Sequence, residues 1–475
     1  MKRTKSKILI ALSLIGLLSS CAPKLSQKIE NRQLPETFGT TTDTTSSGEI
    51  PWREFFKDSN LVALIDTALK RNQELNINLQ EVARKHNEIL ARKGEYLPFV
   101  GLNASTGVDK TARYTPFGAN EATTDIAPGV AMPDPVPDLM FGASASWEID
   151  IWNKLHRAKD AALAEYLASQ EGRNFMITQL VSEIASSYYE LIALDNQLQV
   201  LERNIAIQNN ALEIVKLQKA SSRVNELAVR RFEAQVQKTK AMRYRIRQQI
   251  IESENFLNYL LGRFPQPITR SQESILEIDL QEIKSGKPID LLLNRPDIRA
   301  AEKQLEAAKL NVYVARMQFY PSLDLKAGLG MQAFSASYLL TGPESLLYNA
   351  LGDLSAPLIN RRTLKANYYN ANAEQIEQVY RYEQKLLKAY MEVSNQVSSI
   401  HNLKKGLKYQ SSEVQALNES ITISNDLFRS ARADYMEVLM TQRDALESKF
   451  ELIDTKKEQL LAGVKLYRTL GGGWN

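Results

Sequence analysis

Long stretches of the chain repeat apolar residues with the spacing of an α-helix. In the last stretch, alternating steps of four and three residues separate Leu446, Phe450, Ile453, Leu460, Val464 and Tyr467, with Lys457 in the one polar slot. Leu194, Leu198, Leu201, Ile205, Leu212 and Val215 have the same spacing. Such seams are typical of helices that pack as in a coiled coil, so we interpret them as packing faces. The pattern predicts helices at 61–95, 155–219, 223–261 and 361–429, and a last helix that begins near Asp434.

Shorter runs between these helices alternate apolar and polar residues, which is the period of a β-strand with one wet face. One run contains the apolar residues Phe141, Ala143, Ala145, Trp147, Ile149 and Ile151, and another contains Leu323, Leu325, Ala327, Leu329 and Met331. Residues 97–109 and 346–358 are two further strand candidates. Loops at 110–138 and 335–345 join the members of each pair, so the chain is expected to be mainly α with a small antiparallel β part.

The order helix, strand, loop, strand, long helix, turn, helix occurs twice, which predicts a tandem repeat. A shift of 223 residues places Tyr96 on Phe319, Pro98 on Pro321 and Leu102 on Leu325. Chance similarity between amphipathic helices does not explain a helix-to-strand boundary that falls at proline in both copies. We expect a first repeat at 51–286 and a second at 287–475.

Element lengths favour a tube rather than a globule. Helices at 155–219 and 361–429 would each span roughly 100 Å at ~1.5 Å per residue, which a compact globule does not need. Four strands cannot close on themselves in lipid. Two chains would give a narrow barrel of eight strands, whereas three would give twelve and a water-filled lumen. A trimer is therefore the smallest assembly that makes a duct.

The N-terminus has the pattern of a lipoprotein signal. Basic residues precede the short apolar run at 8–18, and Leu18-Ser19-Ser20-Cys21 then places small residues before the only cysteine. This pattern matches a bacterial lipobox, in which the signal peptide 1–20 is removed and Cys21 is acylated. Residues 21–50 would be a lipidated, extended linker. The alternative is an ordinary signal peptide with an incidental cysteine.

Charge and chemistry exclude several function classes. The chain has a formal charge of +4, no block of basic residues indicates nucleic acid, and no later segment is apolar enough for a membrane helix. The histidines, His86, His156 and His401, are scattered, and no phosphate loop or nucleophile elbow is present. Glu148 and Asp150 could mimic a catalytic pair, but we interpret them as strand acids that face a wet lumen. We expect no enzyme activity, no metal and no cofactor beyond the lipid on Cys21.

Several ordered segments resemble TolC-like outer-membrane efflux proteins of the lipoprotein branch. The resemblance covers roughly 51–475 and is carried by the following segments: Pro51-Trp52-Arg53-Glu54-Phe55-Phe56, Asn258-Tyr259-Leu260-Leu261-Gly262-Arg263-Phe264-Pro265, Leu293-Asn294-Arg295-Pro296-Asp297-Ile298, Phe319-Tyr320-Pro321-Ser322-Leu323 and Leu466-Tyr467-Arg468-Thr469-Leu470-Gly471-Gly472-Gly473-Trp474.

This resemblance implies a homotrimer with a long periplasmic α-barrel and a twelve-stranded transmembrane β-barrel. It implies a lipid-anchored protein in the outer membrane of a Gram-negative bacterium, with a periplasmic adaptor protein and an inner-membrane RND-type transporter as partners. Its function would be that of a passive exit duct that carries small molecules from the periplasm to the outside. A duct of the same fold for type I protein secretion and a structural coiled-coil lipoprotein without a pore remain alternatives.

Two sites implied by the resemblance depart from the family pattern. The turns between helices usually carry glycine, where this chain has Ala220 and Ala431. The predicted adaptor-contacting tips are Ala220, Ser221, Ser222, Arg429, Ala431 and Arg432. The family acid that lines the closed aperture is replaced by Met440, so the predicted aperture consists of Met436, Glu437 and Met440. The alternative is that Glu437 faces outward and pairs with a neighbouring helix.

Overall fold

The computed structural model describes residues 23–38, 45–430 and 432–474. The predicted signal peptide, Cys21, Ala431 and part of the predicted linker lie outside the described residues. The chain divides into two compact units. The strand unit contains the described residues of Met1–Ile29, Ala83–Leu167 and Lys303–Tyr380, and the helical unit contains those of Glu30–Val82, Ala168–Glu302 and Arg381–Asn475.

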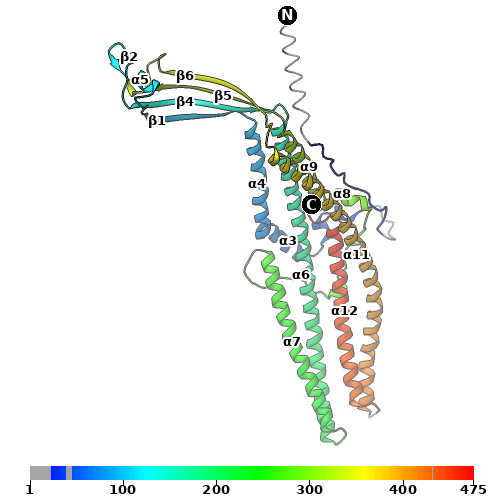
Figure 1. Ribbon diagram of the computed structural model, residues 1–475. Coiled ribbons are helices and arrows are strands. Elements are labelled where there is room, and N and C mark those ends of the chain that lie inside the picture. The colour runs from blue at the N-terminus through cyan, green and yellow to red at the C-terminus, as the bar shows by residue number, and fades with distance from the viewer. Residues whose placement is uncertain (1–22, 39–44, 431, 475) are drawn as a thin grey trace. The chain divides into compact units, whose positions relative to one another are not determined.

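The strand unit contains one four-stranded antiparallel sheet (Figure 1). Its order is β1-β4-β5-β6, so β1 and β6 are the edges. The strands are β1 (Phe99–Asp109), β4 (Val136–Ile149), β5 (Ser322–Ala333) and β6 (Leu346–Ser355). The register pairs Leu102 with Ala143, and Ala143 with Leu329. All four predicted strands are therefore confirmed.

The two loops that join these strands contain more structure than the sequence pattern predicted. The first contains α5 (Pro116–Glu121) and a small hairpin of β2 (Asp125–Ala127) and β3 (Val130–Ala131). The second contains α10 (Ala336–Leu339). Thr115 caps α5 by accepting a hydrogen bond from the Gly118 amide. The start of this helix is therefore determined by a side-chain hydrogen bond, which the spacing of apolar residues does not reveal.

Four helices contribute residues to both units, namely α4 (Gln73–Glu95), α6 (Lys154–Ala220), α9 (Pro296–Met317) and α11 (Arg362–Arg429). The helical unit also contains α3 (Ser59–Arg71), α7 (Glu226–Leu260) and α12 (Tyr435–Thr469). Its shorter elements are η2 (Ser47–Glu49), α2 (Trp52–Phe55), η3 (Ile275–Glu277), η4 (Pro288–Asp290) and α8 (Leu291–Asn294).

The prediction of one helix at 61–95 is wrong, because the chain leaves the helix at Asn72 and begins a second one. Asn72 is buried, and its side-chain amide donates to the Leu260 carbonyl while its side-chain oxygen accepts from the Leu75 amide. The side-chain oxygen thus satisfies the Leu75 amide, which a continuous helix would satisfy through its own backbone. An uninterrupted apolar stripe does not reveal such a break.

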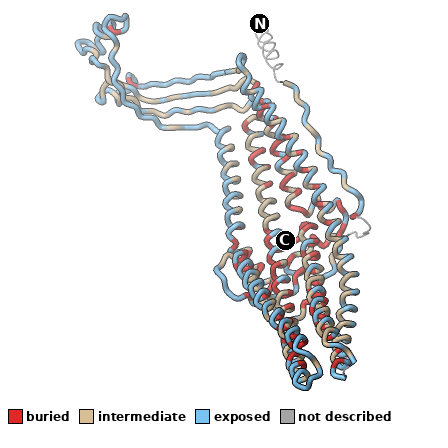
Figure 2. Tube along the Cα trace, turned by 60° about the horizontal axis from the view of Figure 1, so that its bottom comes forward, coloured by how far each residue is buried: buried red, intermediate tan, exposed pale blue. Residues whose placement is uncertain are grey.

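The core of the helical unit lies where α2 and α3 pack against α6, α7 and α12, and buried residues gather there in Figure 2. The aromatic residues Trp52, Phe55 and Phe56 of the opening motif are all buried, and Phe55 stacks on Tyr467 with ring centroids 4.0 Å apart. The predicted seams are confirmed: Leu201, Ile205, Leu446, Ile453 and Leu460 are among the buried residues.

The buried Arg295 ties three helices of the helical unit together. It pairs with Asp297 at 2.8 Å and with Glu392 at 3.0 Å, and it donates to the Thr469 carbonyl at the end of α12. Its side chain is 6% exposed. Burial alone would lower its pKa, but the two carboxylates raise the pKa of Arg295 above its usual value. Arg295 therefore stays charged and acts as a structural crosslink.

The order of elements repeats as the sequence predicted. α6 and α11 have 67 and 68 residues, and α7 and α12 have 35 each. Among the described residues, none of these helices has the length and apolar character required to span a membrane.

Candidate functional site

One face of the sheet in the strand unit is apolar and exposed. Val100 and Leu102 of β1 are 66% and 78% exposed, and Leu329 and Tyr348 of the neighbouring strands are 59% and 76% exposed. The register places these side chains on the same face, because successive residues of a strand point to opposite sides. A broad exposed apolar face requires either lipid or protein to cover it.

The opposite face is mixed in character, with both polar and apolar side chains, and contains a row of carboxylates. The register pairs Glu148 of β4 with Asp324 of β5, and Asp324 with Asp353 of β6. Like charges in directly opposed positions destabilise a sheet, so this row is a functional candidate. The sequence analysis singled out Glu148 and missed Asp324 and Asp353. The sequence could have indicated both acids, because each occupies a polar position of a predicted strand close to a helix boundary.

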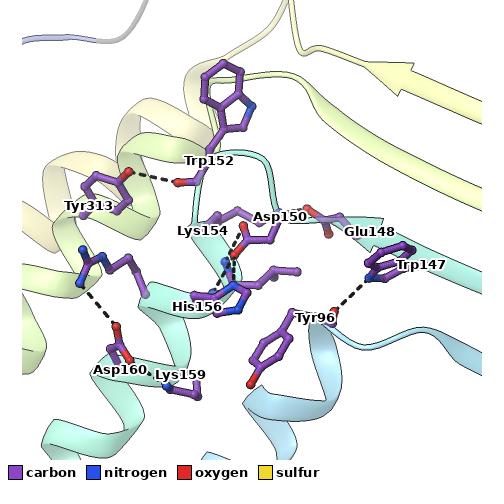
Figure 3. Close-up of polar contacts among 12 residues, drawn as sticks. Tyr96, Trp147, Glu148, Asp150, Trp152, Lys154, His156, Lys159, Asp160 and Tyr313 are labelled. Carbon is purple, nitrogen blue, oxygen red and sulfur yellow. Dashed lines mark hydrogen bonds and ion pairs between the residues drawn. The ribbon is translucent and has the colours of Figure 1, made fainter.

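Asp150 lies beyond the end of β4, at the corner that leads into α6 (Figure 3). Its carboxylate accepts hydrogen bonds from the backbone amides of Leu155 and His156 at 3.1 and 2.9 Å. It also lies 2.7 Å from the His156 ring, which stacks on Tyr96. The prediction that Asp150 shares a strand face with Glu148 is therefore wrong, because its charge is used to cap α6.

The electrostatics of this corner agree with the hydrogen bonds. Burial on its own would raise the pKa of Asp150, but the bonds from Leu155 and His156 outweigh it and the pKa is lowered. Glu148 pairs with Lys154 at the start of α6. Trp147 donates its indole N–H group to the Tyr96 carbonyl (Figure 3). Trp152 donates its indole N–H group to the Pro321 carbonyl. The corner is thus held by specific polar contacts.

The turn between α6 and α7 belongs to the helical unit and contains three predicted tip residues. Ala220 is the last residue of α6, so the expected strain does not fall on it. The left-handed conformation falls on Ser222, with φ of 58°. The Ser222 amide donates to the Lys219 carbonyl and the Arg223 amide donates to the Gln218 carbonyl, which is the pattern of a Schellman cap. Ser222 therefore adopts a backbone conformation in which glycine is favoured.

The first turn is also held by side-chain ion pairs. Glu226 pairs with Lys219 across the turn and with Arg230 at 2.8 Å one helical turn later. The hydrogen bond from Lys219 is the main cause that lowers the pKa of Glu226. The charges of this tip are therefore largely neutralised within it.

The turn between α11 and α12 differs from the first one in its charges. The Arg432 amide donates to the Leu427 carbonyl, which closes the end of α11. Arg429 and Arg432 are exposed, and within the described chain no carboxylate pairs with either guanidinium. Phe428 and Val438 pack with Val215 and Phe232, so the two turns share one apolar cluster.

The predicted aperture residues lie in the first turns of α12, which begins at Tyr435 after Asp434 as predicted. Glu437 is exposed and Met440 is 47% exposed. Met436 is half-buried, and its Sδ lies 3.2 Å from Nη1 of Arg231 on α7. The sequence analysis missed Arg231, because no local pattern connects two residues that are 205 positions apart.

In the part of the chain that the structure describes, no group of three or more histidine, cysteine, aspartate or glutamate residues could hold a metal ion. The histidines lie in separate contacts: His86 packs beside Tyr166, His156 caps with Asp150, and His401 is exposed.

A four-stranded sheet with one apolar face, combined with paired long helices and tight turns, defines the class of outer-membrane exit channels. The family model described as "Outer membrane efflux protein" matches residues 64–263 and 288–472. The chain therefore belongs to the outer membrane efflux protein family. It is the outer-membrane channel component of an efflux system in a Gram-negative bacterium, and it is a transport protein rather than an enzyme.

Relatives and solved structures agree with this assignment. The chain is 27% identical over 423 residues to "Pyoverdine export outer membrane protein OpmQ" of Pseudomonas aeruginosa, covering 89% of this chain and 87% of that protein. It is 26% identical over 474 residues to "Probable outer membrane lipoprotein SilC" of Salmonella typhimurium, covering 98% of each. The fold matches a membrane protein from Pseudomonas aeruginosa with a TM-score of 0.84 at 22% identity, covering 95% of this chain and 99% of that one.

Proposed function

We propose that three copies of this chain form a lipid-anchored duct that conducts small molecules passively from the periplasm to the outside. The observation that carries this proposal is the sheet, which is open at both edges. β1 and β6 are edge strands of 11 and 10 residues, and almost every residue of both is exposed. Unpaired edges of this length invite pairing with another chain.

Closure by three chains follows from strand number. Each chain contributes four strands, so pairing β1 of one copy with β6 of the next gives twelve strands in three copies. Twelve strands leave room for a water-filled lumen, whereas eight are filled by side chains. The apolar face would then contact lipid, and the opposite face with Glu148, Asp324 and Asp353 would line the lumen.

The second turn supports a partner contact. Arg429 and Arg432 are exposed without carboxylate partners among the described residues, whereas the charges of the first turn are paired. Unneutralised charge at a helix turn favours an acidic partner surface. We infer that both tips contact a periplasmic adaptor protein, with an RND-type transporter of the inner membrane supplying the energy. Ala431 is included in this contact as a sequence prediction.

The aperture would be formed by Met436, Glu437 and Met440 from the three copies. A three-fold axis turns each residue into a ring, and three carboxylates of Glu437 would favour cations. Arg231 beside Met436 adds a positive charge near this ring and opposes that preference. The relatives are named for export of pyoverdine, toluene and cations. Family membership therefore does not identify the substrate of this chain, and we infer that the partner pump selects it.

The tandem repeat and the lipid on Cys21 complete the proposal. Two halves at 51–286 and 287–475 are supported by the matching helix lengths on each side of both turns. Acylation of Cys21 is supported by the lipobox pattern and by a relative named as a lipoprotein.

Disulfide trapping between copies tests the assembly. Ser105→Cys on β1 is combined in turn with a cysteine at Leu347, Asn349 or Leu351 on β6, since Cys21 is acylated in the mature chain. We expect oxidation to give bands of two and three chains on a denaturing gel, and the purified protein to have the mass of three chains. Ser144→Cys on the central strand β4 is the matched control, because β5 separates it from β6 by roughly 10 Å. A folded, monodisperse monomer without crosslinked bands would refute the trimer.

A further inference from the structure

The corner between β6 and α11 in the strand unit contains basic side chains without acidic partners. Arg361 lies with its guanidinium carbon 4.8 Å from the ring centroid of Phe319 at the end of α9. Arg362, Lys365 and Arg316 are exposed. Within the described residues, no carboxylate forms an ion pair with any of these four cations. The corner therefore has uncompensated positive charge.

The equivalent corner of the first repeat is neutralised instead. Lys154 pairs with Glu148, and Arg157 and Lys159 lie 3.5 and 3.0 Å from Asp160. Asn153 and Asn360 both have a positive φ, of 53° and 55°, so the two corners share their backbone turn. The difference therefore lies in the side chains, and the positive charge of the second corner is not a requirement of the turn.

Two exposed apolar residues precede the basic ones. Leu358 is 67% exposed and Ile359 is 90% exposed, directly before Asn360. Along the chain, the apolar face of the sheet is thus followed by an apolar pair and then by Arg361 and Arg362. This order matches the passage from the hydrocarbon layer to the phosphate layer of a bilayer.

The N-terminal segment runs beside this corner, which is a second, independent reason to place the corner near the membrane surface. Leu25 packs against the apolar cluster that contains Phe319 and Tyr368. The buried Gln375 on α11 then accepts from the Lys28 amide and donates to the Lys28 carbonyl. Cys21 is only four residues before Leu25, so the Cα atoms of the two residues can be at most about 14 Å apart.

We propose that Arg316, Arg361, Arg362 and Lys365, together with Leu358 and Ile359, form a docking surface for anionic phospholipids of the leaflet that contains the acyl anchor. This inference rests on the proposed acylation of Cys21. The guanidinium and ammonium groups bind the lipid phosphates, and the two apolar side chains enter the acyl region. The surface fixes the height of the helices against the membrane, which the acyl chains alone do not do, since they are joined to the body through an extended segment.

Lipid binding to purified full-length trimers tests the proposal. Acyl-labelled phosphatidylglycerol or phosphatidylcholine is titrated in neutral detergent micelles and binding is followed by fluorescence anisotropy. We expect the wild type to prefer phosphatidylglycerol, and the combined variant R361Q/R362Q/K365Q to lose on the order of 10- to 100-fold of that preference. K404Q/K405Q/K408Q is the matched control, because it removes three exposed lysines from the same helix. Equal loss in both variants, or no preference in the wild type, would overturn the proposal.

Three further measurements distinguish a lipid surface from a small-anion site and from a failed duct. Soluble glycerol phosphate should not compete, and competition equal to that of the lipid would show a small-anion site instead.

A fluorophore on Ile359→Cys should shift its emission to the blue in phosphatidylglycerol vesicles, whereas one on the exposed Tyr409→Cys should not; identical emission would overturn membrane contact. Single-channel conductance is measured in parallel. Normal conductance without lipid preference rejects only the lipid surface, whereas absent conductance in the wild type rejects the proposed duct.

Discussion

Ser222 is the residue at which local conformation and residue type disagree most clearly. A non-glycine residue with φ of 58° crowds its Cβ against the following carbonyl, and only the closing hydrogen bonds of the turn compensate. Glycine removes that crowding but also gives the unfolded chain more freedom.

We expect Ser222→Gly to stabilise the closed turn by about 0.5–1 kcal/mol, because relief of the left-handed strain outweighs the entropy of the unfolded turn. Trypsin cleavage after Arg223 reports local opening of this turn, and its rate should fall roughly two- to fivefold. Ser221→Gly is the control, since the structure gives Ser221 no positive φ, and it should not slow cleavage. An unchanged or faster rate in Ser222→Gly would contradict the strain.

The ion selectivity of the predicted aperture also depends on single residues. If Glu437 lines the narrowest point, Glu437→Gln should reduce the cation preference of trimers in a lipid bilayer, and Met440→Asp should increase it. Arg231→Gln should also increase it, because it removes the positive charge beside Met436. Reversal potentials in a salt gradient measure these changes, with the exposed Glu413→Gln on α11 as the control. Potentials that stay at the wild-type value in all three variants would place the constriction elsewhere.

At this scale the sequence predicted residue types better than contacts. The acid at Glu148 and the methionine pair on α12 follow from local spacing. Arg231 beside Met436 depends on which helices become neighbours, and no single-sequence period contains that information. The strand pattern marks Asp324 and Asp353 as polar positions, but their alignment with Glu148 depends on the strand register.

At the scale of elements, α6 depends on a carboxylate that lies outside it. Asp150 satisfies two amides of the first turn of α6 and places a negative charge at the positive end of the helix dipole. Its pKa is lowered from 3.8, so its contribution to stability is present above about pH 4 and is lost as the pH falls through the lowered pKa.

Asp150→Asn should therefore destabilise the start of α6 by about 1 kcal/mol at neutral pH. The melting temperature of detergent-solubilised protein should fall at pH 7, and the difference from the wild type should disappear well below pH 4. Asp160→Asn is the matched control on the same helix, because its pairs with Arg157 and Lys159 are partly exposed to solvent and contribute little. A difference between Asp150→Asn and wild type that persists in acid would show that charge is not the cause.

The elements themselves followed closely from the sequence where a long period existed. The helices after both turns and all four strands lie at the predicted places, since one buried stripe or one apolar face fixes each of them. The predictions failed where a side chain ends an element, at Asn72 between α3 and α4 and at Asp150 after β4. Such ends are set by hydrogen bonds to a distant carbonyl or to downstream backbone amides, which periodicity does not encode.

At the scale of the whole molecule, anchoring and spanning are separate tasks. The sheet presents an apolar face of side chains such as Leu102 and Tyr348, whereas acyl chains on Cys21 would only attach the chain to a leaflet. The N-terminal segment is fastened to α11 through Gln375, and Phe38 is buried beside Tyr390. The described N-terminal segment is thus joined to the helices by packing and hydrogen bonds.

Cys21→Ala should accordingly block acylation and leave unprocessed precursor in the inner membrane, because lipidation of the cysteine precedes cleavage of a lipoprotein signal. Metabolic labelling with palmitate followed by membrane fractionation measures both effects, and Ser26→Ala, outside the lipobox, is the control that should be labelled normally. If a cleavable secretory signal replaces residues 1–20 of the Cys21→Ala chain, we expect unlabelled trimers in the outer membrane, since strands rather than acyl chains cross the bilayer. Normal palmitate incorporation into Cys21→Ala would reject Cys21 as the anchor, and the absence of trimers from the secreted variant would mean that assembly itself requires the lipid.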